Sequence, residues 1–435
     1  MKDGAMNEKP AYQGGENFDL RTILLHGRKQ RIRERTEFFQ EFLQGLKQRN
    51  QMGCMRVIGS AADREVEVLD PETGETRRML MFGSNNYLGL ANHPYVKAQM
   101  AAAVREFGTG VGGPPLLNGY TTLHRTLEER LADLKGAEDA MLFSSGYAAN
   151  VGLISGLAHA GDRVIYDAYS HASFIDGITL AGVPSFHFPH NDVEALRGLL
   201  DRERQTCTGD LYVGVEGVYS MDGDLAPLRT ILNLCNSRGA MLLLDDAHGT
   251  GAMGPSGHGT PEHFGLKGSI PVVMGTFSKT FAVTGGFVAA SRPLVDYLRF
   301  FSRSYMFSAS LPPPVVASVL AGLDVLECEP DRVEQLHRNV AYAAGTLRSL
   351  GFEIGGETPI LPLRVPSDMD IRSAACEFHA QGIFVNSIEY PAVPANQQRF
   401  RISIMASHTR EDIDRLAGAI GQIWSQAAVA RAAAV

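Results

Sequence analysis

Lys279 is the residue whose type and setting point most directly to chemistry. It lies in the segment Gly275-Thr276-Phe277-Ser278-Lys279-Thr280, directly after the apolar run Val272-Val273-Met274. A lysine at the end of a buried strand, between small hydroxyl residues, has an anchored amine with a polar cradle close by. Those features suit a lysine that forms a Schiff base with a phosphorylated aldehyde such as pyridoxal 5'-phosphate. On its own the segment also fits an ordinary surface lysine.

A second segment, upstream of Lys279, favours the cofactor interpretation. The apolar run Leu242-Leu243-Leu244 ends in Asp245, and His248 follows three positions later. A carboxylate at the end of a strand can keep a pyridine nitrogen protonated, which makes the ring an electron sink. An imidazole beside it can hydrogen-bond the 3-hydroxyl oxygen of the ring. The alternatives are a helix N-cap for Asp245 and a loop histidine for His248.

Length and composition fit a globular enzyme of more than one domain. The chain has 435 residues, 44% hydrophobic and 20% charged, and its net charge of −8 gives no general attraction for nucleic acid or an anionic membrane. The five cysteines lack the paired spacing of a metal site, so we expect reduced thiols and no metal. Residues 1–19 lack the apolar stretch of a signal peptide and no later run reaches membrane-spanning length, so we expect no integral membrane segment and a cytoplasmic location.

The order of apolar segments predicts an α/β fold with a mainly parallel sheet. Between residue 85 and about residue 320, short apolar strands alternate with helical stretches, the strands being Ala140–Phe143, Arg163–Tyr166, Leu211–Val215, Met241–Leu244, Pro271–Met274 and Gly286–Ala290. Strands separated in this way favour a helix-covered parallel sheet, whose ligands bind at the carboxyl ends of the strands. Lys279 and Asp245 both follow such ends.

Two smaller regions flank this core. Residues 1–84 are expected to form an amphipathic arm (28–50), which lies either on another surface or on its own domain, and a hairpin of Glu65–Leu69 and Arg78–Phe82. Residues 85–325 are expected to form the large domain. Residues 326–435 are expected to form a small α+β domain with strands at 352–354, 360–363, 383–385 and 401–404 and a closing helix from Thr409.

Eight segments together resemble the α-oxoamine synthases, a family of the fold-type I pyridoxal-phosphate enzymes. The resemblance covers roughly residues 80 to 420. The segments are 84–90 (SNNYLGL), 108–119 (a glycine-rich run), 145–150 (SGYAAN), 170–173 (SHAS), 216–224 (EGVYSMDGD), 245–248 (DDAH), 275–279 (GTFSK) and 399–401 (RFR). The resemblance implies a mainly parallel, seven-stranded type of sheet covered by helices, with a smaller C-terminal α+β domain.

The resemblance implies a role for each cofactor residue. Lys279 carries the cofactor and then removes the α-proton of the substrate, for which its ordinary pKa of about 10.4 must be lowered by burial and the cationic ring. His171 stacks on the ring, Asp245 pairs with the pyridine nitrogen and His248 with the 3-oxygen. The other implied contacts are Ser145, the backbone N–H groups of Gly146 and Tyr147, Thr276, Ser220, and Ser308 with Ala309 from the partner subunit of a homodimer. His171 has the alternative of a loop histidine, and Ser220 and Ser308 that of packing or capping.

Arg401 is the candidate for binding the substrate carboxylate, because a guanidinium binds carboxylate bidentately. Asn85 is expected to assist it. Two alternatives stay open here: Arg399 lies two residues away on the same face, and Asn86 is adjacent to Asn85.

The implied reaction is a decarboxylative Claisen condensation of a small amino acid with an acyl thioester, giving an α-amino ketone. Pro114 and Pro115 stand where relatives carry a small hydroxyl residue, often followed by arginine. Pro114 is therefore expected near the amino-acid side chain, where it cannot donate a hydrogen bond. The C-terminal segments favour a serine palmitoyltransferase-like use of serine or alanine with a medium-to-long acyl chain. The alternatives are 8-amino-7-oxononanoate synthase, glycine C-acetyltransferase, an aminotransferase, or an idle partner subunit, and the donor is acyl-coenzyme A or an acyl carrier protein.

Overall fold

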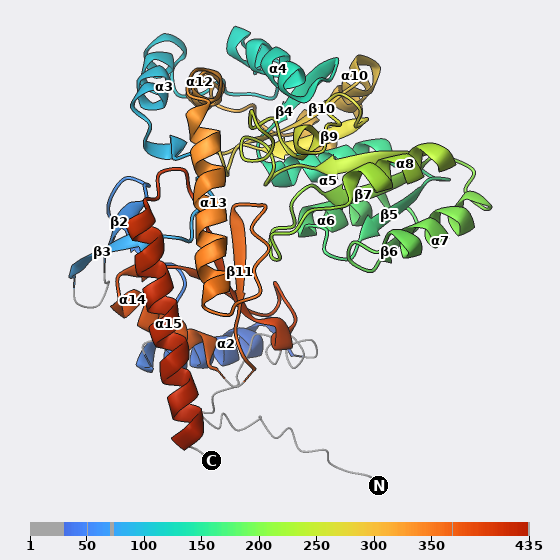
Figure 1. Cartoon of the computed structure of the whole chain (residues 1–435). Helices are drawn as coiled ribbons and strands as arrows, with labels where there is room; N and C mark the ends of the chain where they lie inside the picture. Colours follow the sequence, from blue (N-terminus) through green and yellow to red (C-terminus); the bar gives the residue numbers. More distant parts are fainter. Residues whose placement is uncertain (1–29, 50, 70–73, 368, 434–435) are drawn as a thin grey trace.

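The large sheet dominates the fold and confirms the α/β class. The computed structural model describes residues 30–49, 51–69, 74–367 and 369–433 (Figure 1). The sheet has seven strands in the order β4-β10-β9-β8-β7-β5-β6. Only β10 runs antiparallel to its neighbours β4 and β9, and the other pairs are parallel. The strands are β4 Asp139–Phe143, β5 Arg163–Asp167, β6 Ser185–Phe188, β7 Leu211–Glu216, β8 Ala240–Asp245, β9 Val272–Thr276 and β10 Gly286–Ala290.

The six strands predicted for this region are all present. The seventh strand, β6, was not predicted from the sequence. This strand lies at the edge of the sheet, and only Phe188 among its four residues is buried. A short, half-exposed edge strand lacks the apolar run by which the central strands were found. The central β8 shows why the others are recognisable: Leu242 and Leu244 pack into one core and Leu243 into the other, because successive side chains point to opposite faces.

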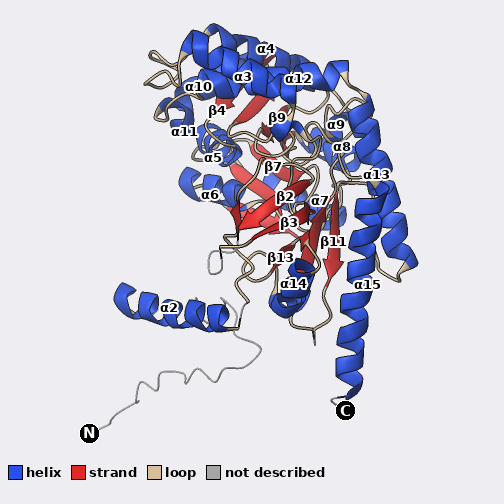
Figure 2. Ribbon diagram, turned by 90° about the vertical axis from the view of Figure 1, so that its left-hand side faces the viewer, coloured by secondary structure: helices blue, strands red, loops and turns tan. Residues whose placement is uncertain are grey.

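Helices cover both faces of the sheet (Figure 2). The core that contains Leu242 includes α7 and α8, and the core that contains Leu243 includes α5, α6 and α10. The helices of this region are α3 Pro94–Phe107, α4 Thr122–Lys135, α5 Gly146–Leu157, α6 Ala172–Ala181, α7 Val193–Arg204, α8 Leu228–Arg238, α9 Thr260–His263, α10 Arg292–Phe301, α11 Arg303–Met306 and α12 Pro313–Cys328, with a 3-10 turn η1 at Leu90–Asn92.

The C-terminal part has a three-stranded antiparallel sheet of order β11-β14-β13, against which long helices pack. Helices α13 and α15 lie side by side in both ribbon views (Figures 1 and 2). Its elements are α13 Asp331–Ser349, β11 Ile360–Arg364, α14 Ile371–Ala380, β12 Ile383–Phe384, β13 Asn386–Ile388, η2 Ala395–Gln397, β14 Arg399–Ser403 and α15 Arg410–Ala433.

The strand expected at Phe352–Ile354 is wrong. Phe352 instead belongs to the C-terminal cap of helix α13. Its N–H donates to the carbonyl of Leu347 at 3.2 Å, after Gly351 takes a positive φ of 90°. The phenyl ring then packs edge-on against Trp424, with ring centroids 5.5 Å apart. Phe352 and Ile354 therefore serve helix capping and core packing rather than a sheet.

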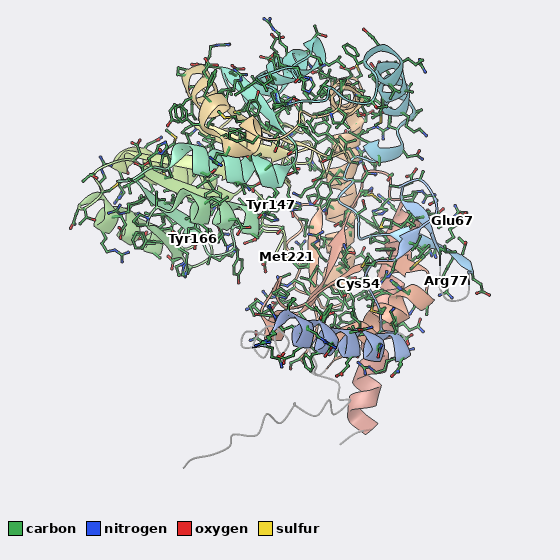
Figure 3. The ribbon with its side chains drawn as sticks, turned by 180° about the vertical axis from the view of Figure 1, so that it is seen from behind. Cys54, Glu67, Arg77, Tyr147, Tyr166 and Met221 are labelled. Atoms are coloured by element: carbon green, nitrogen blue, oxygen red, sulfur yellow. The ribbon has the colours of Figure 1, made fainter. Side chains whose placement is uncertain are left out.

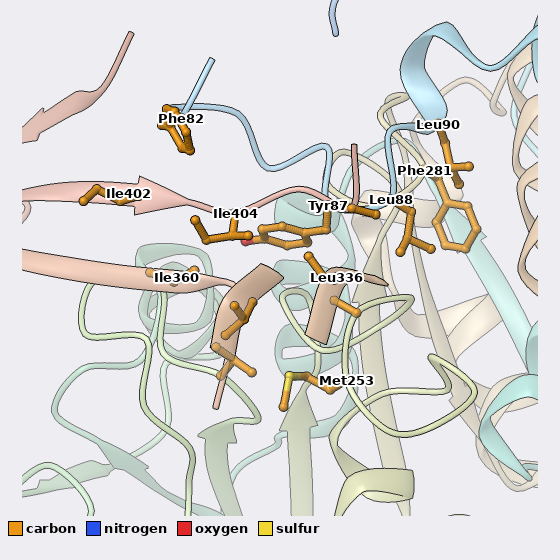
Figure 4. Packing of buried hydrophobic residues seen from close by; sticks show 14 of the residues in the cluster. Phe82, Tyr87, Leu88, Leu90, Met253, Phe281, Leu336, Ile360, Ile402 and Ile404 are labelled. Carbon is orange, nitrogen blue, oxygen red and sulfur yellow. The ribbon is translucent and has the colours of Figure 1, made fainter. Parts of the chain in front are cut away.

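The N-terminal hairpin is joined to the C-terminal part through a shared sheet. Strands β2 Glu65–Leu69 and β3 Thr76–Met81 pair antiparallel, as expected, although residues 70–73 of their turn lie outside the described residues. Strand β1 Val57–Ile58 pairs with β2, and β12 adds to β3 in parallel. Buried side chains from residue 80 to residue 423 form one core, part of which surrounds Tyr87 and Leu336 in Figure 4.

The N-terminal arm lies on its own chain. Helix α2, Ile32–Gln48, buries Phe42 and Leu46, and the guanidinium of Arg372 lies 5.4 Å from the Phe42 ring. Gln51, just after the helix, donates to Asp370 at 2.9 Å. The arm therefore contacts the C-terminal part of its own chain through Arg372 and Asp370. Residues 1–29, including the expected polar start, lie outside the described residues. Within the described part of the chain no helix is long and apolar enough to cross a membrane.

Candidate active site

The side chain of Lys279 lines a cavity of about 260 Å³ at the carboxyl ends of the central strands. It stands in a tight turn after β9, in which Ala282 takes a left-handed φ of 55° and donates its N–H to the carbonyl of Lys279 at 3.0 Å. Such strain at a non-glycine residue is typical of functional turns. Burial lowers the pKa of the Lys279 amine, while the carboxylates of Asp245 and Glu216 act in the opposite direction. The amine is thus nearer to a usable base than an ordinary lysine.

Most of the predicted cofactor residues line this same cavity. They come from five separate segments of the chain and meet at one edge of the sheet, as parallel topology requires. The predicted residues in the lining are Ser145, Gly146, Tyr147, His171, Ser220, Asp245, His248, Thr276 and Lys279. Figure 3 labels Tyr147, from this lining, and Met221, next to Ser220, between the large sheet and the C-terminal strands.

Helix α5 points its N-terminus into the cavity. Ser145 caps it, because its hydroxyl accepts the N–H of Ala148 at 3.0 Å and its carbonyl that of Ala149. The N–H groups of Gly146 and Tyr147 are the first of the helix and have no place in the intrahelical ladder, which suits an anion. Position 146 requires glycine, since a Cβ there would lie 2.8 Å from the side chain of Thr276. The hydroxyl of Thr276 donates to the carbonyl of Gly285 at 3.0 Å.

A chain of hydrogen bonds connects Asp245 to His171. The Asn150 amide donates to Asp245 Oδ2 at 2.7 Å and to Ser173 Oγ at 2.9 Å. Ser173 Oγ lies 2.7 Å from His171 Nδ1, which also accepts the backbone N–H of Ser173 at 3.2 Å. With Nδ1 accepting, a neutral His171 ring carries its proton on Nε2. The carboxylate and the imidazole expected on the cofactor ring are therefore oriented by one network.

His248 is buried and is kept neutral. Burial lowers the pKa of His248 well below its ordinary value, and the positive charges of Lys279 and Arg401 lower it further. Its Nδ1 lies 2.7 Å from the hydroxyl of Tyr87, which in turn lies 3.4 Å from Asn85 Oδ1. Tyr87 thus connects the cofactor side of the cavity to the predicted substrate-binding pair. A neutral imidazole can give or receive a hydrogen bond at the 3-oxygen of a pyridoxal ring.

Arg401 lies on β14 beside the cavity with incomplete hydrogen bonding. Its guanidinium donates to Asn85 Oδ1 and to the carbonyl of Ser220, both at 3.3 Å, and its buried Nε has no partner among the described residues. Asn86 is buried and accepts the N–H of Ala91 at 3.2 Å. The structure therefore places Asn85, rather than Asn86, next to the guanidinium.

Arg399 is already occupied. It is 1% exposed, forms an ion pair with Asp222, and donates to the carbonyl of Met221 at 3.2 Å. A guanidinium with a full set of protein acceptors is not available to a ligand carboxylate. Arg401 is the arginine of this strand that retains donors for a substrate.

His190 joins the turn of His171 to the loop of Ser220. Its ring lies 3.0 Å from Asp167 and 2.8 Å from Asp224, and it stacks on Tyr169 with centroids 4.2 Å apart. Burial alone would lower its pKa, but the hydrogen bonds to Asp167 and Asp224 raise the pKa to about 9. The imidazolium therefore holds together two segments that carry cavity residues.

Ser308 and Ala309 line a different, small cavity of about 10 Å³ together with Pro115 and Tyr120. The glycine-rich loop forms a turn there, in which Gly119 donates its N–H to the carbonyl of Pro114 at 3.0 Å. The loop is joined to the segment after Ala309, because the N–H of Ser310 donates to the carbonyl of Gly113 at 3.1 Å. Pro114 is not among the residues that line the Lys279 cavity. Within one chain these residues stand apart from the cofactor site.

The chain is similar in sequence and in fold to known proteins. The family described as aminotransferase class I and II matches residues 77–420. A putative 8-amino-7-oxononanoate synthase of Desulfovibrio desulfuricans is 41% identical over 83% of this chain and 92% of its own length. The serine palmitoyltransferase of Sphingobacterium spiritivorum is 37% identical over 92% of this chain and 98% of its own length. A solved structure of SPT (serine palmitoyltransferase) with PLP is 33% identical, with a TM-score of 0.85 over 92% of this chain and 100% of that one.

The chain belongs to the α-oxoamine synthase family. Its fold-type I architecture and its use of pyridoxal phosphate, both expected from the resemblance, are confirmed. A crystal structure of 8-amino-7-oxononanoate synthase from Francisella tularensis, 23% identical with a TM-score of 0.69, shares the fold.

Four residues of this α-oxoamine synthase site were not assigned a role from the sequence: Asn150, Ser173, Tyr87 and Glu216. Each lies inside one of the segments that carry the family resemblance. Their contacts join residues far apart in the chain, as Asn150 joins Asp245. Their presence in those segments was the available signal, but only the folded chain shows which residue each one touches.

Proposed function

We propose that Lys279, His171, Asp245, His248 and Arg401 carry out the condensation of serine or alanine with a medium-to-long acyl thioester. The family defines the reaction class, a decarboxylative condensation of an amino acid with an acyl thioester that releases the thiol and carbon dioxide. The observation that carries the proposal is a single cavity that contains a pKa-lowered lysine, a buried carboxylate and an open helix N-terminus, next to an arginine with free donors.

These residues fit the cofactor. Asp245 would accept a hydrogen bond from the pyridine N–H, and His248 would bind the 3-oxygen. Gly146 and Tyr147 would bind the phosphate through backbone N–H groups, with the hydroxyl of Thr276 beside them. Bound pyridoxal phosphate withdraws electrons from the α-carbon of the amino acid, which makes that carbon acidic and then nucleophilic.

The side chains of this protein perform the remaining work. Arg401 and Asn85 hold the amino-acid carboxylate, which fixes the α-proton with respect to Lys279. Lys279 Nζ removes that proton, for which its lowered pKa is suited. The Nε2–H of His171 donates a hydrogen bond to the thioester oxygen as negative charge develops there.

The role of His171 in the condensation can be separated from its role in binding. His171→Phe keeps an aromatic face for the ring but removes the Nε2 donor. We expect this variant to bind the cofactor and lose thiol release by about 100- to 1,000-fold, the usual cost of an oxyanion donor. Cofactor absorbance and thiol release measured on one sample distinguish the two effects. Full activity in His171→Phe would remove the proposed oxygen contact.

The test of the function uses glycine, alanine and serine in combination with acyl-coenzyme A thioesters of several lengths, with thiol release and the product mass as readouts. Serine or alanine with a medium-to-long chain is expected to be the best pair. Relatives by sequence include 8-amino-7-oxononanoate synthases, so the second candidate is the pair that would give such a product, alanine with a seven-carbon dicarboxylic acyl thioester. Thiol release with no amino acid preference, or amino transfer to an oxo acid, would contradict the proposal. A matching acyl carrier protein tests the other donor.

A homodimer is the proposed assembly, with Ser308 and Ala309 reaching the phosphate site of the partner. The supporting observation is the exposure of large apolar side chains around them, with Phe307 71% and Leu117 82% exposed. A second copy would cover these residues. We expect light scattering to give twice the chain mass, and Ser308→Ala to weaken cofactor binding. A monomer with full activity would contradict this assembly. The cytoplasmic location stays a prediction.

A further inference from the structure

Glu216 is the cavity residue for which the reaction described above has no use. It ends strand β7 and pairs in register with Asp245 at the end of β8, so that two carboxyl groups stand side by side. Glu216 is 3% exposed and lines the Lys279 cavity. A second buried carboxylate beside Asp245 lowers the stability of the fold, because neighbouring carboxylates in a low-dielectric site repel each other. Protonation of one of the two removes this repulsion.

One oxygen of Glu216 lacks a partner. Among the described residues, no group hydrogen-bonds the buried Oε1 atom. The backbone N–H groups of Ser220 and His171 are near enough to the carboxyl group to lower its pKa. The Glu216 side chain therefore lies between the two segments that carry Ser220 and His171, and its Oε1 atom is without a partner among the described residues. An unpaired buried oxygen destabilises the site, and a bound ligand that hydrogen-bonds this oxygen would remove the penalty.

The charged groups around Glu216 favour its protonated form. Burial raises the pKa of Glu216 well above its ordinary value, and the Asp245 carboxylate on β8 raises it further. Lys279, after β9, and the two backbone N–H groups act in the opposite direction. His171 at the start of α6 and Tyr219 after β7 complete the ionisable surroundings. In the proposed function, the Asp245 carboxylate is the acid that would pair with the protonated pyridine nitrogen of the cofactor.

We propose that Glu216 is a positioning residue that works as a neutral acid. Its carboxyl group orients the His171 and Ser220 segments between which it lies. Its unpartnered oxygen carries a proton, which it donates to an acceptor oxygen of the cofactor–substrate adduct. This inference rests on the proposed assignment of the Lys279 site. It distinguishes the two adjacent acids by charge, with Asp245 as the anion and Glu216 as the donor. A neutral donor adds a hydrogen bond to the site without competing with Asp245 for the cationic ring.

Glu216→Gln and Glu216→Ala test the proposal, since the amide keeps an uncharged donor of the same shape and alanine removes it. The readouts are the dissociation constant of pyridoxal phosphate and the absorbance of the bound cofactor from pH 6 to pH 9. We expect Glu216→Gln to stay within about 3-fold of the wild type with an unchanged band, and Glu216→Ala to bind at least about 10-fold more weakly with a shifted band. Equal losses in both variants would mean that Glu216 acts as an anion, and wild-type behaviour of Glu216→Ala would mean that it has no such role.

A second measurement covers the case in which Glu216→Ala does not fold. The infrared difference between the wild-type holoenzyme and Glu216→Gln should contain the carbonyl stretch of a protonated carboxyl group. Its absence would overturn the proposal. A failure of the function proposed above looks different, because the wild type itself would then show no cofactor band that depends on Lys279.

Discussion

Two lysine–carboxylate clusters lie at the same end of strand β8, and they differ in how completely the protein satisfies them. Asp246 is fully buried and forms a 2.8 Å ion pair with Lys135. Lys135 also donates to the carbonyl of His258 at 2.7 Å, and Asp246 accepts from the hydroxyl of Thr260 at 2.6 Å and that of Thr250 at 3.2 Å. Every charge in this cluster has a partner from the chain, so the cluster serves the fold.

The Lys279 cluster contains polar atoms that the protein leaves without hydrogen-bond partners. Asp245, the neighbour of Asp246, faces a cavity together with Lys279 and Glu216, and the free oxygen of Glu216 and the Nε of Arg401 are without partners among the described residues. The comparison teaches that a buried charge with complete partners indicates structure, whereas buried polar atoms that face an opening indicate a ligand.

The largest effect that sharpens this comparison is expected at Lys279. Lys279→Ala removes the amine that binds the cofactor and moves the proton, so we expect thiol release to fall by at least about 1,000-fold. The free energy of unfolding should change by less than about 1 kcal/mol, because the amine faces a cavity. Activity and urea unfolding on the same preparation check both statements. An active Lys279→Ala enzyme would break the functional half of the comparison.

The matched substitution in the other cluster should have the opposite outcome. Lys135→Ala leaves the Asp246 carboxylate buried and uncompensated, which costs about 3–5 kcal/mol of stability. We expect a lower midpoint of urea unfolding with little change in activity per folded molecule. If Lys135→Ala were as stable as the wild type, complete pairing would not be what distinguishes the two clusters.

Part of the site and of the fold could be predicted from the sequence, and part could not. The strand ends, and with them Lys279, Asp245 and His248, follow from apolar runs and parallel topology, and His171 from the family resemblance. The choice of Asn85 over Asn86 depends on which one meets Arg401 from a strand some three hundred residues away. The strand expected at Phe352–Ile354 failed because Gly351 continues into a helix cap, a local geometry that an apolar run does not reveal.

A third, intermediate effect is expected from the two arginines of β14. Arg401→Ala should raise the KM for the amino acid by about 10- to 100-fold, the usual worth of hydrogen bonds to a charged group, with unchanged stability. Arg399→Ala should instead lower the unfolding midpoint, because the partly buried Asp222 loses its buried partner and keeps only Arg364, 4.0 Å away and largely exposed. Steady-state kinetics and urea unfolding of both variants separate the roles. Reversed outcomes would exchange the two assignments.

The smallest effect concerns pH and His190. Because the folded state raises its pKa to about 9 from an ordinary value of about 6.5, the imidazolium stabilises the fold fully below about pH 6.5 and loses that contribution as pH rises through about 9. The thermal midpoint of the wild type relative to His190→Gln should follow this curve between pH 6 and pH 10. A difference that does not vary with pH would mean that the ring is held in its neutral form.

The most direct test of the account maps the lysine that holds the cofactor. The holoenzyme is treated with borohydride to fix the cofactor, digested, and analysed by peptide mass spectrometry, with Lys279→Ala as the control. The account predicts the reduced cofactor mass on the peptide that contains Lys279 and its loss in the variant. Cofactor mass on the peptide of Lys135 or of any other lysine in the wild type would contradict it.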